Sequence, residues 1–236
     1  MKDLCFCVYG DAPALRYARN SLASWGYSVC HQPETAVTHL LLPVPIFDLD
    51  VMPVLERLPD TVTVFGGNLP ALPVRSVDLL QDPYYTAENA AITAHCALRI
   101  LMQTCKRTLT GAKILILGWG RIAKCLAPLL ASLGAQVTIA ARKNTDRAMA
   151  MALGFGATSL PLESGTGFDG IINTVPAPVM DAKNTREGAI LLDLASKKGL
   201  IGDDVLWERG LPGRLAPESA GMLIAKTVLR YALGKE

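Results

Sequence analysis

Short apolar runs alternate with amphipathic stretches along most of the chain, and this alternation predicts its secondary structure. In the first third, the predicted strands cover residues 4–9, 27–30, 38–42 and 61–65, and the predicted helices cover residues 12–25 and 51–58. Strands that alternate with helices predict a parallel sheet with right-handed crossovers.

The same alternation continues in the second half of the chain. There, the predicted strands cover residues 113–117, 136–141, 157–160, 170–173 and 189–194, and the predicted helices cover residues 121–133 and 144–153. Two further helices are expected. A long and largely apolar helix covers 86–105, with Thr86 as its N-cap, and a final helix covers 217–233.

These elements predict an α/β protein. We expect a Rossmann-type doubly wound parallel sheet together with a second, smaller flavodoxin-like α/β domain. The polar segment 106–111 is the expected boundary. The expected domains are residues 1–105, which include the inter-domain helix 86–105, residues 106–216, which form the nucleotide-binding domain, and residues 217–236, a C-terminal helix that packs back on the first domain.

A glycine-containing turn follows the apolar strand over 113–117 and precedes a helix. Gly118-x-Gly120-x-x-Ala123 is the dinucleotide-binding pattern in the context that it requires. The first glycine permits the turn, the second lets the backbone approach a pyrophosphate, and the small Ala123 lets helix and strand pack closely. The predicted cofactor-binding residues of this turn are Gly118, Trp119, Gly120, Arg121 and Ile122.

The end of the next predicted strand indicates which nucleotide binds. An Asp or Glu that selects NAD is expected about 20 residues after the glycines. Ala141, Arg142, Lys143 and Asn144 stand there instead. Two cations and no carboxylate suit a 2′-phosphate, so Arg142 and Lys143 predict NADP. The alternative is that both belong to a solvated loop.

The carboxyl ends of other strands are expected to line the cofactor crevice. The segment 173–178 contributes Thr174, Val175 and Pro176, and the segment 193–198 contributes Asp193 and Ala195. Asp193 has an equally supported alternative, a structural role in capping the turn that follows it.

Composition narrows the class of protein. The 236 residues are 50% hydrophobic and 19% charged, with a net charge of +2, so no polyanion-binding surface is expected and no nucleic acid is implied. No signal peptide and no apolar stretch long enough for a membrane span is seen, so we expect a cytoplasmic protein. The six cysteines and three histidines form no metal-ligand pattern, and no metal site is expected.

A 2-hydroxy-acid dehydrogenase is the obvious interpretation of such a scaffold, but its proton relay is missing. That reaction needs an acid–base group, usually a histidine paired with a carboxylate. No histidine follows His95, and Ser196 and Lys197 stand where an arginine is expected. The substrate chemistry must therefore differ.

Several segments together resemble the A-type subunit of dipicolinate synthase. These are residues 117–123 (LGWGRIA), 140–142 (AAR), 172–176 (INTVP), 191–196 (LLDLAS), 210–221 (GLPGRLAPESAG) and 89–94 (NAAITA). The resemblance covers residues from about 79 to 232, while residues 1–78 match in layout only.

The resemblance implies a function in sporulation, on a branch of lysine biosynthesis. It implies oxidation of a dihydrodipicolinate-type dicarboxylate to dipicolinate, with NADP as the hydride acceptor and a flavoprotein-like B-type subunit as partner. Aromatisation of the ring supplies driving force, which explains the missing late histidine. A homo-oligomer is also expected.

The resemblance also implies site residues. The family continues Thr-Ala-Glu-Gly where this chain has Thr93, Ala94, His95 and Cys96. Either His95 replaces the glutamate as a base, or the protein is a divergent relative, or His95 is an ordinary helix residue. The candidate catalytic residues are His95 and Ser196. The candidate substrate-binding residues are Asn89, Thr93, Lys197, Arg214 and Ser219. The start of the final helix, at Ala216 and Pro217, is expected to receive an anion, and these two residues are predicted to bind the cofactor.

Two other functions remain open. One is a nucleotide-binding partner or regulatory subunit that is inactive alone. The other is an NADP-dependent dehydrogenase of another small acid, such as a shikimate-type enzyme. The latter predicts a Lys–Asp pair in the first domain, and the chain has no lysine between Lys2 and Lys106.

Overall fold

The structure, a computed structural model, describes residues 4–33, 36–46, 50–162 and 164–234. The chain forms two compact units. The first contains residues 1–92 and 212–236, and the second contains residues 93–211. The division falls inside the long helix α3 (Pro83–Thr104) and not at the expected boundary after residue 105, because the first turns of this helix pack with the first unit.

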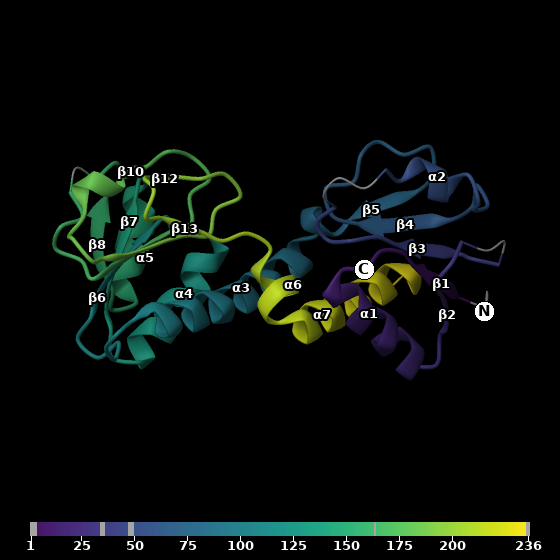
Figure 1. Cartoon of the computed structure of the whole chain (residues 1–236), viewed down its shortest axis with the longest axis horizontal. Helices are drawn as coiled ribbons and strands as arrows, with labels where there is room; N and C mark the ends of the chain where they lie inside the picture. The colour runs from purple at the N-terminus through teal and green to yellow at the C-terminus, as the bar shows by residue number, and fades with distance from the viewer. Residues whose placement is uncertain (1–3, 34–35, 47–49, 163, 235–236) are drawn as a thin grey trace. The chain divides into compact units, whose positions relative to one another are not determined.

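The first unit has a five-stranded, wholly parallel sheet (Figure 1). Its strands are β1 (Cys5–Val8), β2 (Ser28–Cys30), β3 (His39–Leu41), β4 (Thr63–Gly66) and β5 (Ser76–Asp78). The order β2-β1-β3-β4-β5 is the flavodoxin order, which confirms the predicted fold of this half. The strand β5 was not predicted, since Val77 is its single apolar residue and carries no periodicity.

Helices cover both faces of this sheet. Phe6 and Val8 pack with α1 (Pro13–Ser24) and α7 (Pro217–Ala232), while Cys7 points to the opposite face, where α2 (Met52–Leu55) packs. The C-terminal helix α7 therefore belongs to the core of the first unit, and it runs beside α1 (Figure 1).

The start of α3 differs from the prediction. The helix begins at Pro83, after a short 3₁₀ turn over Leu79–Gln81, and the buried Asp82 caps it by accepting the Tyr85 N–H at 2.6 Å. The Thr86 hydroxyl instead donates to the Asp82 carbonyl at 2.9 Å. The predicted Thr86 cap is wrong because Asp82 and Pro83 form the stronger start signal, an acceptor followed by proline.

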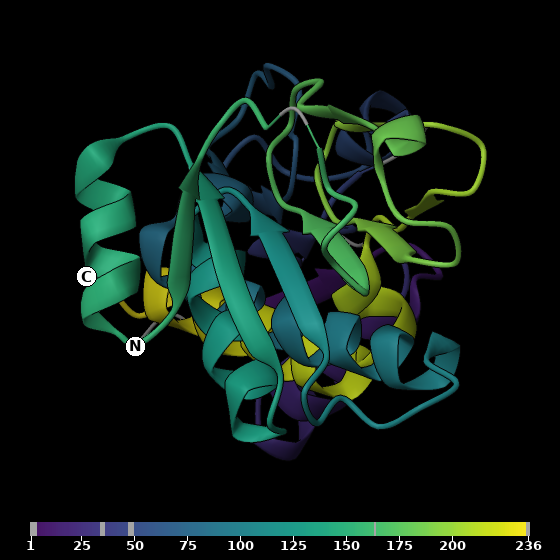
Figure 2. The same ribbon diagram turned by 90° about the vertical axis from the view of Figure 1, so that its left-hand side faces the viewer.

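The second unit has a six-stranded parallel sheet in the order β13-β11-β9-β6-β7-β8, and several of its strands are seen side by side in Figure 2. Its strands are β6 (Lys113–Leu117), β7 (Gln136–Ala141), β8 (Gly156–Ser159), β9 (Gly170–Asn173), β11 (Ile190–Asp193) and β13 (Leu206–Trp207). Counted from β6, this is the order 3-2-1-4-5-6 of a Rossmann sheet, so the predicted doubly wound fold is confirmed.

The helices α4 (Arg121–Ser132) and α5 (Asn144–Ala152) pack on this sheet at or within one residue of their predicted bounds. The short elements were missed. They are β10 (Met180–Asp181), β12 (Leu200–Ile201), β13, α6 (Leu211–Leu215) and a 3₁₀ turn over Ala182–Asn184. Elements of two to five residues carry too few positions for a period to be seen.

None of the helices in the described ranges combines the length and the apolar character that crossing a membrane requires.

Candidate functional site

The glycine turn lies where the order of the second sheet reverses, between β6 and β9. Gly118 follows β6 with a φ of +96°, a backbone conformation that residues other than glycine rarely adopt. A Cβ on Gly118 would lie 2.7 Å from Thr174 Oγ1 and 2.8 Å from Val175 Cγ2. The turns after β6 and β9 therefore touch each other, and only glycine fits at this contact.

Gly120 presents open space at the start of α4. It is the N-cap residue of this helix, and no atom lies within 4 Å of the position that a Cβ would occupy. No side chain caps the helix and its first turn contains no acidic residue, so its free N–H groups and partial positive charge suit an anion. Ala123 is fully buried, as close packing of helix on strand requires.

Trp119, between the two glycines, is only 8% exposed. Its ring meets the edge of Phe155 at a centroid distance of 5.9 Å. Its buried Nε1 has no hydrogen-bond partner among the described residues. An unpaired buried donor costs about 1–3 kcal/mol, so the turn holds a donor that the folded chain leaves unused. In the same turn, Arg121 is exposed and Ile122 is half-buried.

The loop after β7 presents Arg142 and Lys143 to solvent. The described structure gives neither side chain a hydrogen bond or an ion pair, so both are available to a phosphate. Arg147 fixes the backbone of this loop. Its guanidinium donates to the Ala141 carbonyl at 2.7 Å, to the Arg142 carbonyl at 2.9 Å and to the Asn144 side chain. Sequence reasoning missed Arg147, although an arginine in the first turn of the helix after the strand is a signal that could have been used.

The carboxylate of Asp193 has a structural role. It is fully buried, and its carboxylate accepts hydrogen bonds from Asn173 Nδ2 and from the N–H groups of Ala195, Gly199 and Leu200 at 2.7–3.0 Å. The capping alternative is confirmed, because both oxygens of this carboxylate accept N–H groups of the loop that follows β11. The cofactor contact of Asp193 stays a prediction.

Asn173 completes this buried network and was missed as a site residue. Its side chain bonds the Val175 N–H and carbonyl, both at 2.9 Å, and so sets the loop after β9. Thr174 donates its hydroxyl to the Leu117 carbonyl at 2.8 Å, next to the glycine turn. Val175 is half-buried and Pro176 is exposed, so the loop surface is available while its backbone is fixed.

The remaining candidates are divided between the units. In the second unit, Ala195 is 4% exposed, Ser196 and Lys197 are exposed beyond β11, Thr93 is buried and His95 is exposed. In the first unit, Asn89, Ala216 and Pro217 are half-buried, and Arg214 and Ser219 are exposed. Of these residues, Ala195, Ser196 and Lys197 lie at the carboxyl end of a strand of the second sheet, as the glycine turn does.

The N-terminus of α7 is a poorer anion site than that of α4. Ala216 is its N-cap and Pro217 occupies its first turn, as predicted for a helix start, but Glu218 adds a negative charge to the same turn.

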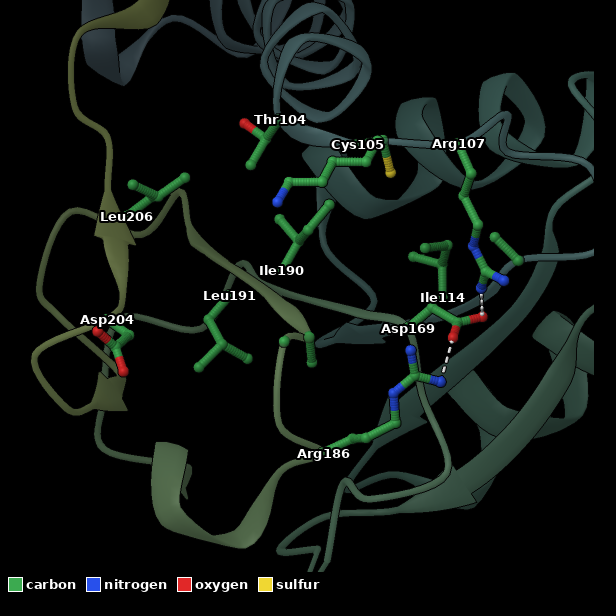
Figure 3. A pocket seen from close by; sticks show the side chains of 14 residues that line it. Thr104, Cys105, Arg107, Ile114, Asp169, Arg186, Ile190, Leu191, Asp204 and Leu206 are labelled. Atoms are coloured by element: carbon green, nitrogen blue, oxygen red, sulfur yellow. Dashed lines mark hydrogen bonds and ion pairs between the residues drawn. The ribbon is translucent and has the colours of Figure 1, made fainter.

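A cavity of the second unit lies at the amino-terminal edge of the sheet, opposite the glycine turn, and none of the predicted site residues lines it (Figure 3). At its side, Arg107 and Arg186 both point to Asp169, at 2.6 and 2.7 Å. The pKa of Asp169 is lowered, first by the hydrogen bond from the Lys113 N–H and then by these two arginines. Burial acts in the opposite direction but is outweighed. Both arginines are already paired, so this cavity is less suited than the carboxyl edge to an anionic ligand.

The six cysteines are all unbridged, and within the described ranges no three His, Cys, Asp or Glu side chains gather as metal ligands would.

These features define the class of protein: a chain of two α/β units, one flavodoxin-like and one of the Rossmann type, whose glycine turn lies at the switch point of its sheet. No family model matches the chain. The A-type subunit of dipicolinate synthase from Bacillus subtilis is 28% identical over 196 residues, and the match covers 74% of this chain and 66% of that protein, just under two thirds of its length.

Solved structures show the same fold. The A-type subunit of dipicolinate synthase from Bacillus halodurans superposes with a TM-score of 0.83 at 20% identity, covering 97% of each chain. A transhydrogenase from Sinorhizobium meliloti superposes with a TM-score of 0.74 at 16% identity, covering 98% of this chain and 85% of that one. The resemblance to the A-type subunit of dipicolinate synthase that the motifs indicated is therefore confirmed.

Proposed function

We propose that the second unit binds NADP at the glycine turn. The observation that carries this proposal is the start of α4, where Gly120 leaves open space beside uncapped N–H groups and no acidic residue repels a phosphate. Arg142 and Lys143, at the end of the neighbouring strand, would hold the 2′-phosphate. The N–H groups at the start of α4 suit the pyrophosphate of the cofactor, and the two cations suit its 2′-phosphate.

We further propose that the chain is the nucleotide-binding subunit of an enzyme that oxidises a dihydrodipicolinate-type dicarboxylate to dipicolinate. This rests on the similarity to the A-type subunit of dipicolinate synthase. Oxidation of the dihydropyridine ring removes one hydride and one proton. NADP, when bound, supplies the hydride acceptor.

The residues of this chain would provide the remaining steps. His95 would take the ring proton, and the Ser196 hydroxyl would hold the substrate beside it. Within the second unit, Lys197 and Thr93 would bind a carboxylate of the substrate. Asn89, Arg214 and Ser219 stay candidate carboxylate ligands of the first unit. No strong acid–base relay is required because the ring becomes aromatic.

The test is a titration of the purified chain with NADPH and with NADH, followed by Trp fluorescence or calorimetry. We expect NADPH to bind more tightly than NADH. The double variant Arg142→Gln/Lys143→Gln should weaken NADPH binding by about tenfold per lost phosphate contact and leave NADH binding unchanged. Lys183→Gln, an exposed lysine outside the site, is the control.

Equal affinity for NADH and NADPH in the unmodified chain would show that Arg142 and Lys143 do not select the nucleotide. Binding of neither nucleotide would refute the nucleotide-binding function itself.

A further inference from the structure

The first unit contains a cavity of about 780 Å³ that the proposed function does not use. It lies at the amino ends of the parallel strands, beside Leu4, Ser28, His39 and Thr63, and is closed on one side by Leu233 at the end of α7. Ligands of open α/β sheets bind at the carboxyl ends of the strands, so this cavity is at the opposite edge of its sheet.

His39 forms one wall of this cavity. Its ring packs against Phe6 and Phe65, at centroid distances of 5.1 and 5.9 Å, and its Nδ1 lies 2.8 Å from Thr38 Oγ1. The same Thr38 hydroxyl bonds the Cys5 backbone, which fixes it in place. The imidazole is therefore held rigidly, and Nε2 is the ring nitrogen left for a ligand.

Arg75 supplies the positive charge of the cavity. Burial, and then the nearby Arg75 guanidinium, lower the pKa of His39, so the imidazole is neutral at pH 7. The described structure gives the Arg75 side chain no hydrogen bond and no ion pair. Among the described residues that line the cavity, none is acidic.

Hydroxyl groups surround the two basic side chains. Tyr27, Ser28, Thr61 and Thr63 all line the cavity, and no side-chain hydrogen bond within the described structure engages their hydroxyls. Four hydroxyls, a guanidinium and an imidazole nitrogen thus converge on one space, each with hydrogen-bonding capacity to spare.

The charge of the cavity indicates which anion fits. One arginine matches one carboxylate in a bidentate pair. The last turn of α7, at Leu233, presents backbone carbonyls and the negative end of the helix, which disfavours a multiply charged anion such as phosphate. We propose that this cavity, the His39–Arg75 pocket, binds a small monocarboxylate, with Arg75 on the carboxylate and with His39 and the hydroxyls on its polar substituents.

Proton NMR of the histidine rings tests this proposal. The chain has three histidines, and His31 and His95 are exposed outside the pocket, so their resonances serve as internal references. The whole chain is titrated with sodium lactate, sodium benzoate and inorganic phosphate, each against sodium chloride at equal ionic strength. Arg75→Gln tests the pocket, and Arg57→Gln, an exposed arginine of the same unit outside it, is the matched control.

We expect lactate or benzoate to shift the His39 resonances alone, and to do so saturably. Arg75→Gln should weaken this binding by about tenfold or more, and Arg57→Gln should leave it unchanged. Absence of a saturable His39 shift with both carboxylates, an equal response in Arg75→Gln, or a response to phosphate alone would each overturn the proposal. Because the readout needs no nucleotide and no turnover, its failure is distinguishable from a failure of the NADP proposal.

Discussion

Asp193 shows how much one buried carboxylate organises. It accepts four hydrogen bonds in the interior of the second unit, which orient the loop after β11 and lock it to the loop after β9. Both loops lie at the carboxyl edge where the nucleotide is proposed to bind. A fully buried residue can therefore set the shape of the site.

Replacement of this carboxylate gives a prediction for stability. In Asp193→Asn, an amide NH₂ would face backbone N–H donors, so we expect a loss of about 3 kcal/mol in the free energy of unfolding. Urea denaturation measures it, with the exposed Asp203→Asn as the control. A loss no larger than that of the control would contradict the structural role assigned to Asp193.

Asp82 gives a prediction for pH dependence. Burial raises the pKa of this carboxyl, but the Tyr85 N–H, the Tyr231 hydroxyl and Arg230 together lower it below 3.8. A carboxyl with a lowered folded-state pKa stabilises the fold above pH 3.8, and this contribution is lost as the pH falls through the folded value. Urea denaturation from pH 7 to pH 3 should show this loss.

The variant Asp82→Asn isolates that contribution. We expect it to be about 2–3 kcal/mol less stable at pH 7 and to lose less stability than the unmodified chain as the pH falls. Asp60→Asn, on the surface of the same unit, should follow the unmodified chain. An unchanged acid slope in Asp82→Asn would show that Asp82 is not the group responsible.

At the scale of elements, α7 packs in the core of the first unit, and its approach to α1 is closest at Gly221. A Cβ on Gly221 would lie 2.4 Å from the Ala14 carbonyl oxygen and 2.7 Å from the Ala18 nitrogen, both on the backbone of α1. Only glycine lets the two helices approach this closely.

We therefore expect Gly221→Ala to destabilise the protein by about 1–3 kcal/mol or more, because backbone atoms cannot rotate out of the way. Thermal unfolding measures the change. Gly213→Ala in α6 is the matched control, since no atom lies near its Cβ position and its stability should be unchanged or slightly higher. Equal effects of the two substitutions would exclude close helix packing as the reason for Gly221.

The two glycines of the nucleotide turn should respond differently to substitution. Gly120→Ala adds a methyl group in open space, so we expect normal stability but weaker NADPH binding, by about tenfold or more. Gly118→Ala should destabilise the fold as well, because of its positive φ and its contact with Thr174.

Calorimetry with NADPH and thermal unfolding separate these two effects. Gly167→Ala, in the same unit and also in open space, is the control for Gly120→Ala. Full NADPH affinity in Gly120→Ala would mean that the pyrophosphate does not approach this position.

At the scale of the whole molecule, we propose that the oxidation requires this chain together with a partner subunit. We expect the chain alone to bind NADP and to turn over slowly or not at all, and a flavoprotein-like B-type partner to raise the rate of dipicolinate formation. Absorbance of the product in reactions with and without that partner tests this. If the chain alone reaches the full rate, the partner is not required. If neither mixture turns over, the proposed oxidation is refuted.

The order of the elements was predictable because hydrophobic periodicity is local and strong in this chain. The strands β6, β7 and β9 were predicted at their observed bounds. The glycine turn was predictable for the same reason, since its strand and helix flank it directly. The strands β5, β10, β12 and β13 could not be predicted. Each has only two or three residues, too few for a hydrophobic period, and forms because a neighbouring strand pairs with it.

The sequence alone determined the two α/β folds, the nucleotide turn and the pair of cations after β7, because each depends on residues that are close together in the chain. Tertiary structure decided which residues face a ligand and which face the interior. The capping role of Asp193 depends on N–H donors from the loop that folds over it. The place of α7 in the first unit depends on its packing against α1, which lies about 200 residues earlier in the chain. Burial and hydrogen-bond partners are set by long-range contacts, which local patterns do not contain.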